Sequence, residues 1–119
     1  KAYVELPTTT HMRMMVNGTL AELESYRRLI YRVERRDTKW KISRLTSINE
    51  SDNLRPVIVG QDLHVIPQDF NGLRSSYQFL AYVRQAVGGQ ISQDLLGTDR
   101  PEEVERLYKE TNAWLRAGA

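Results

Sequence analysis

The sequence predicts an α+β domain in which a curved antiparallel sheet is followed by two C-terminal helices. From Thr8 to Asp52 the sequence interleaves β-branched, aromatic and Met residues with charged ones, which is the alternation of half-buried strands. Two short turn signals, Asn17-Gly18 and Asp37-Thr38, divide this stretch into strands. Residues 73–119 instead show apolar residues at helical spacing.

Length and composition indicate one globular domain. We expect it to span residues 1–119, with a sheet in 1–52, a loop traverse in 53–72 and a helical extension in 73–119. The 17 basic and 15 acidic residues nearly cancel, so we expect neither a nucleic-acid nor a membrane partner. Without cysteine the chain has no disulfide and no Cys-ligated metal, which fits a cytoplasmic protein.

The two turns fix a register for each predicted hairpin. Asn17-Gly18 is the stronger signal, because a type I′ turn needs a positive φ at both central positions. A two-residue loop there pairs Val16 with Thr19, Met14 with Ala21, Arg13 with Glu22, Met12 with Leu23 and His11 with Glu24. A two-residue loop at Asp37-Thr38 pairs Arg35 with Trp40, Glu34 with Lys41, Val33 with Ile42 and Tyr31 with Arg44. Both registers match charge and polarity across the strands.

These registers give the sheet one apolar and one polar face. We expect the apolar face to be buried, and Trp40 with it. It comprises Met12, Met14, Leu23, Leu29, Tyr31, Val33, Trp40, Ile42 and Ile48. The polar face is expected to meet solvent and comprises His11, Arg13, Glu22, Glu24, Arg28, Arg32, Glu34 and Lys41.

The remainder of the chain is predicted to be a traverse and two helices. Pro and Gly punctuate residues 53–72. A helix is expected over 75–87, where Gly88-Gly89 ends it. Asp99 and Glu102 resemble a capping box around Pro101, and Gly118 is expected to end the helix that follows. Its buried stripe is predicted to be Val104, Leu107, Tyr108, Thr111 and Leu115.

Several polar residues interrupt the predicted apolar face, namely Ser25, Arg27, Tyr31, Arg44, Thr46 and Glu50. A buried guanidinium is costly without a partner, so Arg27 and Arg44 should either meet a carboxylate such as Glu50 or line a wet cavity. The first alternative is a structural ion-pair network, and the second is a ligand site. A β-bulge would move any of these residues to the other face.

Familiar catalytic motifs are absent from the sequence. There is no P-loop, Rossmann glycine pattern, nucleophile elbow or HExxH. Because only His11 and His64 are present, we expect no metal site and no cofactor. The arginine doublets are split between the two faces and interleaved with glutamates, which disfavours an RNA-binding stripe.

The run ESYRRLIYRVERRDTKWKISRLTSINESDNLRPV resembles the last hairpin of SnoaL-like proteins in the nuclear transport factor 2-like (NTF2-like) superfamily. The tail from Ser75 to Leu115 is similar to the helical extension of a bacterial subgroup of that family. The resemblance implies the cone fold, in which a bent sheet wraps N-terminal helices around a pocket. Such helices are not visible in this sequence. We therefore expect helices before Lys1 or a partner subunit, most simply in a homodimer.

The resemblance implies a cofactor-independent small-molecule enzyme, such as a cyclase, dehydratase or isomerase acting by acid–base chemistry in an apolar pocket. The alternative is a non-catalytic ligand-binding or dimerisation module of the same fold. The expected catalytic residues are Tyr31 as hydrogen-bond donor, Arg44 as anion stabiliser, Glu50 as acid or base and His11 in reserve. The expected ligand-binding residues are Met12, Met14, Arg27, Trp40 and Ile48.

Overall fold

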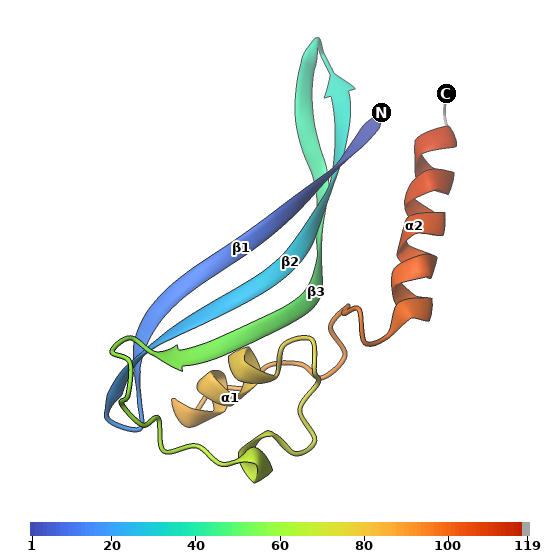
Figure 1. The fold of residues 1–119 in the computed structure, drawn as a ribbon. Helices are drawn as coiled ribbons and strands as arrows, with labels where there is room; N and C mark the ends of the chain where they lie inside the picture. The colour runs from blue at the N-terminus through green and yellow to red at the C-terminus, as the bar shows by residue number, and fades with distance from the viewer. Residues whose placement is uncertain (118–119) are drawn as a thin grey trace.

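The computed structural model describes residues 1–117 and confirms the α+β class. Its sheet has three antiparallel strands in the order β1 (Ala2–Val16), β2 (Thr19–Arg36) and β3 (Lys39–Pro56). A 3-10 helix η1 (Pro67–Phe70), a helix α1 (Gln78–Ala86) and a longer helix α2 (Pro101–Arg116) follow. The strands are long and strongly bent, with α1 beneath one end of the sheet and α2 beside the other (Figure 1).

The first hairpin has the predicted register. Asn17 and Gly18 both adopt positive φ, at 50° and 84°, as a type I′ turn requires. Every pair expected from that turn is present, from Val16 opposite Thr19 to His11 opposite Glu24. The strand β1 also begins earlier than the first expected strand residue, Thr8, because residues from Ala2 onward pair with β2.

The second hairpin has the predicted turn but two bulges. Asp37 and Thr38 have positive φ, and the register holds as far as Val33 opposite Ile42. Ser43 is then skipped, so that Tyr31 lies opposite Leu45 rather than Arg44. Glu50 is skipped in the same way between the Tyr26–Ser51 and Arg27–Asn49 pairs. Each bulge moves the following β3 side chains to the other face of the sheet.

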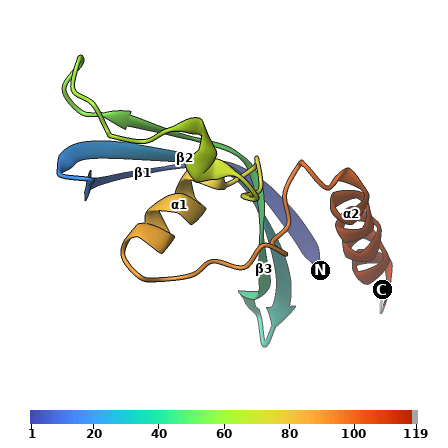
Figure 2. The ribbon, with the colours of Figure 1, turned by 90° about the horizontal axis from the view of Figure 1, so that it is seen from below.

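The two helices cover opposite faces of the sheet, as the view from below shows (Figure 2). On the α1 face, Val16 and Ala21 form a buried cluster with Leu63 and Val83. On the α2 face, a second cluster is made by Ile30, Ile48, Val104 and Leu107. The sequence led us to expect one buried face. Ile48 was assigned to the wrong face, because the bulge at Ser43 places it opposite Arg28, beneath α2.

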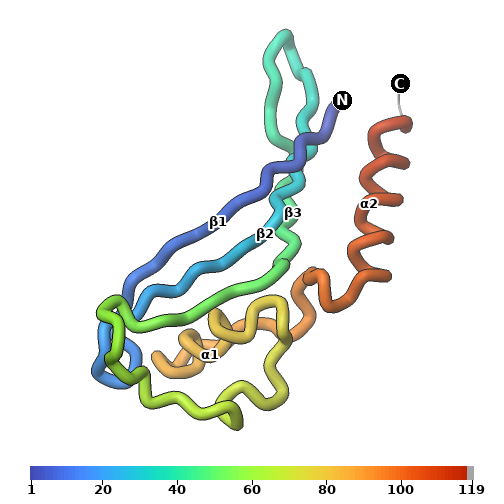
Figure 3. The backbone as a smooth tube through the Cα atoms, viewed as in Figure 1, coloured from blue at the N-terminus to red at the C-terminus, as the bar shows by residue number. Residues whose placement is uncertain are grey.

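The hairpin tip extends beyond both helices (Figure 3). Past the pair of Ala2 with Val33, β2 and β3 continue without β1 as a two-stranded ribbon. Trp40 is 58% exposed and Ile42 is 62% exposed in this ribbon. The predicted burial of Trp40 is therefore wrong, although its pairing with Arg35 is right. The reason is coverage rather than register, since neither helix reaches the tip.

The helix predictions are confirmed in outline. The helix α1 lies within the expected range, and after it Gly88 has a φ of 81°. Helix α2 buries Val104, Leu107 and Thr111 of its predicted stripe. Its start lacks the expected capping box, because Asp99 instead accepts hydrogen bonds from Arg74 and Ser76. The predicted end signal at Gly118 lies outside the described residues.

Candidate functional site

The structure does not bring the four expected catalytic residues together. Tyr31 follows the odd-numbered side chains of β2 and faces the α1 side of the sheet. Arg44 lies opposite Arg32 and therefore faces the α2 side, where Glu50 also makes its contact. His11 lies at the other end of the sheet, opposite Glu24. The bulge at Ser43 is what separates Arg44 from Tyr31, whereas His11 lies where the first turn placed it.

Glu50 has a different partner from the one expected. Its Oε1 atom lies 2.7 Å from Nε of Arg28, and the Arg28 side chain is only 27% exposed. The Nη1 group of Arg28 also donates to the Tyr108 hydroxyl at 3.0 Å, and that hydroxyl donates to Glu5. These four side chains tie the sheet to α2. Of the two alternatives that the sequence left open, Glu50 takes the structural one, but with Arg28 instead of Arg44.

Arg44 lines a charged groove between β3 and α2, with a volume of about 360 Å³. The groove contains both basic and acidic side chains, so it offers no single sign of charge to a ligand. Of the expected site residues, only Arg44 reaches it. The lining consists of Arg44, Thr46, Asp94, Leu96, Glu103, Arg106, Leu107 and Glu110.

The expected ligand-binding residues are also dispersed. Ile48 is fully buried in the core under α2, and Met14 packs against the cluster under α1. Met12 is half-buried two residues before Met14 in β1, whereas Trp40 is exposed at the hairpin tip. Arg27 is half-buried and donates to Ser25 at 3.1 Å. None of these five residues lines either of the two grooves described in this section.

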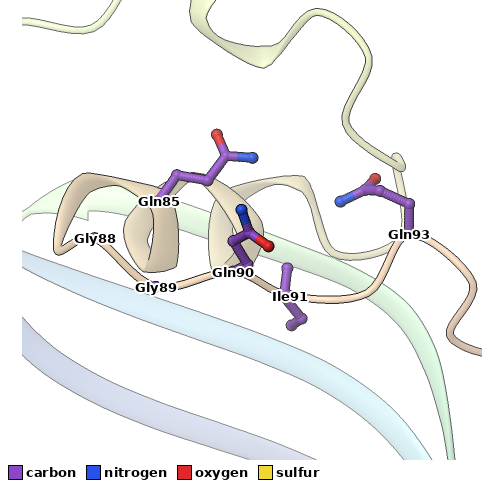
Figure 4. A pocket seen from close by; sticks show the side chains of 6 residues that line it. All are labelled: Gln85, Gly88, Gly89, Gln90, Ile91 and Gln93. Atoms are coloured by element: carbon purple, nitrogen blue, oxygen red, sulfur yellow. The ribbon is translucent and has the colours of Figure 1, made fainter.

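A second, larger groove follows the end of α1 and measures about 530 Å³ (Figure 4). Its walls are three glutamines, Ile91 and the backbone of two glycines, namely Gln85, Gly88, Gly89, Gln90, Ile91 and Gln93. None of these side chains titrates in the physiological range. The groove can therefore offer amide hydrogen bonds, but it has no general acid or base of its own.

Polar side chains converge on the uncovered half of the α2 face. His11 lies close to Glu22 and Glu24, and Arg55 contacts both carboxylates. The hydroxyl of Tyr26, which donates to Glu24, holds the pKa of that carboxyl below its ordinary value, and Arg55 and His11 act in the same direction. Glu24 is thus an ionised carboxylate although it is only 7% exposed. The sequence indicated the pairing of His11 with Glu24 but not the convergence of all five residues.

Asp52 was not among the expected site residues. Its Oδ2 atom accepts the Leu80 backbone N–H at 2.9 Å, and its Oδ1 atom is buried without a hydrogen-bond partner among the described residues. Burial raises the pKa of this carboxyl above its ordinary value. Leu80 lies in the first turn of α1, where backbone N–H groups lack helical partners, so Asp52 of β3 caps this helix from the sheet. Only the acidic exit of the second hairpin, ESD, hinted at it in the sequence.

Replacing Asp52 with alanine should lower the free energy of unfolding by roughly 1 kcal/mol, because a helix N-terminus loses its acceptor. Asp52→Asn should stay much closer to the wild type, since an amide oxygen still accepts the Leu80 N–H and no charge is left buried. Urea unfolding of the two variants at neutral pH measures both. Equal losses in the two variants would contradict the capping role.

The α1 face beyond α1 carries the largest exposed apolar surface on the sheet. Leu6 lies beside Leu29, Val4 beside Tyr31 and Leu45, and Val33 beside Ile42, on successive rungs that point to the same side. We call this surface the apolar patch, and it comprises Val4, Leu6, Leu29, Tyr31, Val33, Trp40, Ile42 and Leu45. Five of these residues are about half exposed, from 48% for Leu6 to 62% for Ile42.

No protein-family model matches this chain, and neither does any curated protein. Within residues 1–117, no helix has the length and apolar character needed to span a membrane.

Proposed function

We propose that the chain is an association module of the NTF2-like cone class, and that it forms a homodimer through the apolar patch. The observation that carries this proposal is the exposure of Val4, Leu6, Trp40, Ile42 and Leu45 on one side of the sheet. With about half of each residue accessible, the patch exposes on the order of 500 Å², toward the upper end of the largest patches on monomers. A standard interface buries about 800 Å² on each partner, so the patch would form the apolar centre of such an interface and the polar residues around it would supply the rest.

Two charges favour a second copy as the occupant. Arg27 lies at the foot of the patch, and its Nε atom is buried without a partner among the described residues. Asp37 is exposed at the hairpin tip. These residues stand five positions before and five after Arg32, near the middle of the patch. A two-fold axis that lies between the two patches, parallel to the sheets and perpendicular to β2, therefore opposes Arg27 of one copy to Asp37 of the other.

Sedimentation velocity of the 119-residue chain tests the proposal. We expect a concentration-dependent dimer, and Ile42→Glu or Leu45→Glu should shift it to monomer, because each places a charge in the apolar interface. Ile58→Glu is the matched control, since Ile58 is 61% exposed in the loop after β3 and lies outside the patch. A monomeric wild-type chain that does not bind a hydrophobic dye would show that no association surface exists.

Charge reversal tests the two-fold arrangement separately. Arg27→Glu and Asp37→Arg should each weaken the dimer, and the double variant should recover it, because the ion pair is restored with its ends exchanged. If the single variants weaken the dimer and the double variant does not recover it, a different two-fold arrangement is present. The Ile42→Glu result remains the test of the patch itself.

A cofactor-independent acid–base enzyme is the second candidate. Asp52 favours it, because a buried carboxyl with a raised pKa and one free oxygen is typical of general acids. Asp52→Asn separates this role from capping. Loss of proton exchange on an enolisable carbonyl compound, with unchanged folding stability, would support the enzyme. Absence of such exchange in the wild-type chain would remove this candidate.

A further inference from the structure

His11, Glu22 and Glu24 form a compact set of potential metal ligands. The Nδ1 atom of His11 lies 3.5 Å from Glu22 Oε1 and 3.8 Å from Glu24 Oε1. All three ligand atoms lie within 4.8 Å of one another. Ligands bound tetrahedrally at zinc distances stand about 3.4 Å apart. The three atoms therefore need only small side-chain adjustments to surround one ion.

The backbone fixes this set in place. His11 lies directly opposite Glu24 across the β1–β2 ladder, and Glu22 is the next residue of β2 on the same face. The type I′ turn at Asn17-Gly18 sets that register, and the ligands thus lie on paired strands rather than on loops. A site on regular strands holds its ligands more precisely than one built from loops.

Arg55 is the resident cation of this cluster. Its Nη2 atom lies 2.8 Å from Glu24 Oε1 and 3.2 Å from Glu22 Oε2, whereas its side chain is 51% exposed. A long and half-exposed side chain can move into water without disturbing the strands. Arg55 would then compete with a metal ion for the two carboxylates, and its removal should favour the ion.

We propose that His11, Glu22 and Glu24 bind one divalent transition-metal ion, with Zn²⁺ as the representative, and that water fills the remaining position. An imidazole nitrogen beside two carboxylates suits zinc and its neighbours, whereas Ca²⁺ and Mg²⁺ take oxygen ligands. His11 is more than half exposed, which leaves the site open to solvent. The site faces away from the apolar patch, so it does not depend on dimerisation.

Zinc titration of the 119-residue chain by isothermal calorimetry tests the site. We expect one equivalent of zinc to bind. His11→Ala should weaken binding by at least about tenfold, because loss of a residue that only supports a metal ligand already costs about that much affinity. Glu22→Gln should weaken it as well. Arg55→Met should tighten binding, because it removes the competing cation.

His64 provides a matched control. It lies 3.4 Å from a single carboxylate, Asp62, and both side chains are well exposed. His64→Ala should therefore leave zinc affinity unchanged, and circular dichroism should show that each variant remains folded. Binding that survives His11→Ala, or a wild-type chain that binds no zinc, would overturn the proposal. If the wild-type chain binds no zinc, the cluster is an ion-pair network closed by Arg55. That conclusion holds even if the Arg55→Met variant binds the metal.

Discussion

Replacing Asp99 with alanine should lower the free energy of unfolding by roughly 3 kcal/mol, because it breaks a largely buried ion pair. Nε of Arg74 lies 2.5 Å from Asp99 Oδ2, and Nη2 donates to Oδ1 at 2.8 Å. The two side chains are only 11% and 20% exposed. Ser76 donates a further hydrogen bond to Oδ1 at 2.8 Å. Alanine would leave both donors without their acceptor.

This pair joins the segments that precede the two helices. Arg74 lies just before α1 and Asp99 just before α2, and Arg74 also donates to the Gln93 carbonyl at 2.7 Å. Gly97 is buried against the same contact, where a Cβ atom would overlap Ser76 Oγ and Asp99 Oδ1. The loop therefore needs glycine there to close around the pair. We expect the loss of Asp99 to loosen the whole connection between α1 and α2.

The pH dependence of stability follows from the same contact. The hydrogen bond from Arg74 lowers the pKa of Asp99 from 3.8 to about 2. The folded pKa is thus below the unfolded one, so the carboxylate stabilises the fold fully above pH 3.8 and loses this effect as the pH falls toward 2. The stability gap between the wild type and Asp99→Ala should accordingly narrow below pH 3.8.

Urea unfolding at neutral pH and at acid pH measures both expectations. Asp94→Ala is the matched control. Asp94 is 88% exposed, and its carboxylate lies 3.5 Å from Arg100, farther than Asp99 lies from Arg74. It should change stability by less than about 1 kcal/mol, as exposed ion pairs do. If Asp99→Ala proves no more damaging than Asp94→Ala, the buried pair does not hold the two helices together.

The hairpins could be predicted from the sequence because their signals are local. Asn17-Gly18 and Asp37-Thr38 specify turns, and the charges of Arg13 and Glu22 agree with the register that follows. The bulges had no comparable signal. Ser43 and Glu50 occupy positions where an alternating pattern continues equally well without a skip. A single skipped residue moves the side chains that follow it to the opposite face of the sheet. The expected site residues are therefore dispersed in the structure, although the turn that defined their register was predicted correctly.

Long-range coverage was the other part that the sequence did not reveal. The residues around Trp40 do not indicate that α1 and α2 end short of the hairpin tip. Their extent depends on where the two helices, which come later in the chain, pack on the sheet. Helix α2 packs on the face of the sheet that carries Ile30 and Ile48, and Ile48 reaches that face only through the bulge at Ser43. Among the expected site residues, His11 kept its predicted neighbour because no bulge lies between it and its turn.

Replacing Ile48 with alanine should lower the free energy of unfolding by about 3 to 4 kcal/mol, as large-to-small changes in a packed core do. Ile48 is fully buried and contacts the cluster of Ile30, Val104 and Leu107 between the sheet and α2. Alanine would leave a cavity there, because the long strand and the helix cannot close around the lost atoms without shifting. Helix α2 should also become easier to cleave by protease.

Leu45→Ala is the matched control for Ile48→Ala, since both residues belong to β3 and lie on either side of the same sheet. Leu45 is 53% exposed in the apolar patch, so its truncation should change the unfolding of the monomer by less than about 1 kcal/mol. Thermal melts in dilute solution, where association is negligible, compare the two. Without the bulge at Ser43, Ile48 would share the face of Leu29 and Trp40, and its truncation would cost no more than that of Leu45. A large difference between the variants is therefore direct evidence for the bulge, because only the skipped residue places Ile48 beneath α2.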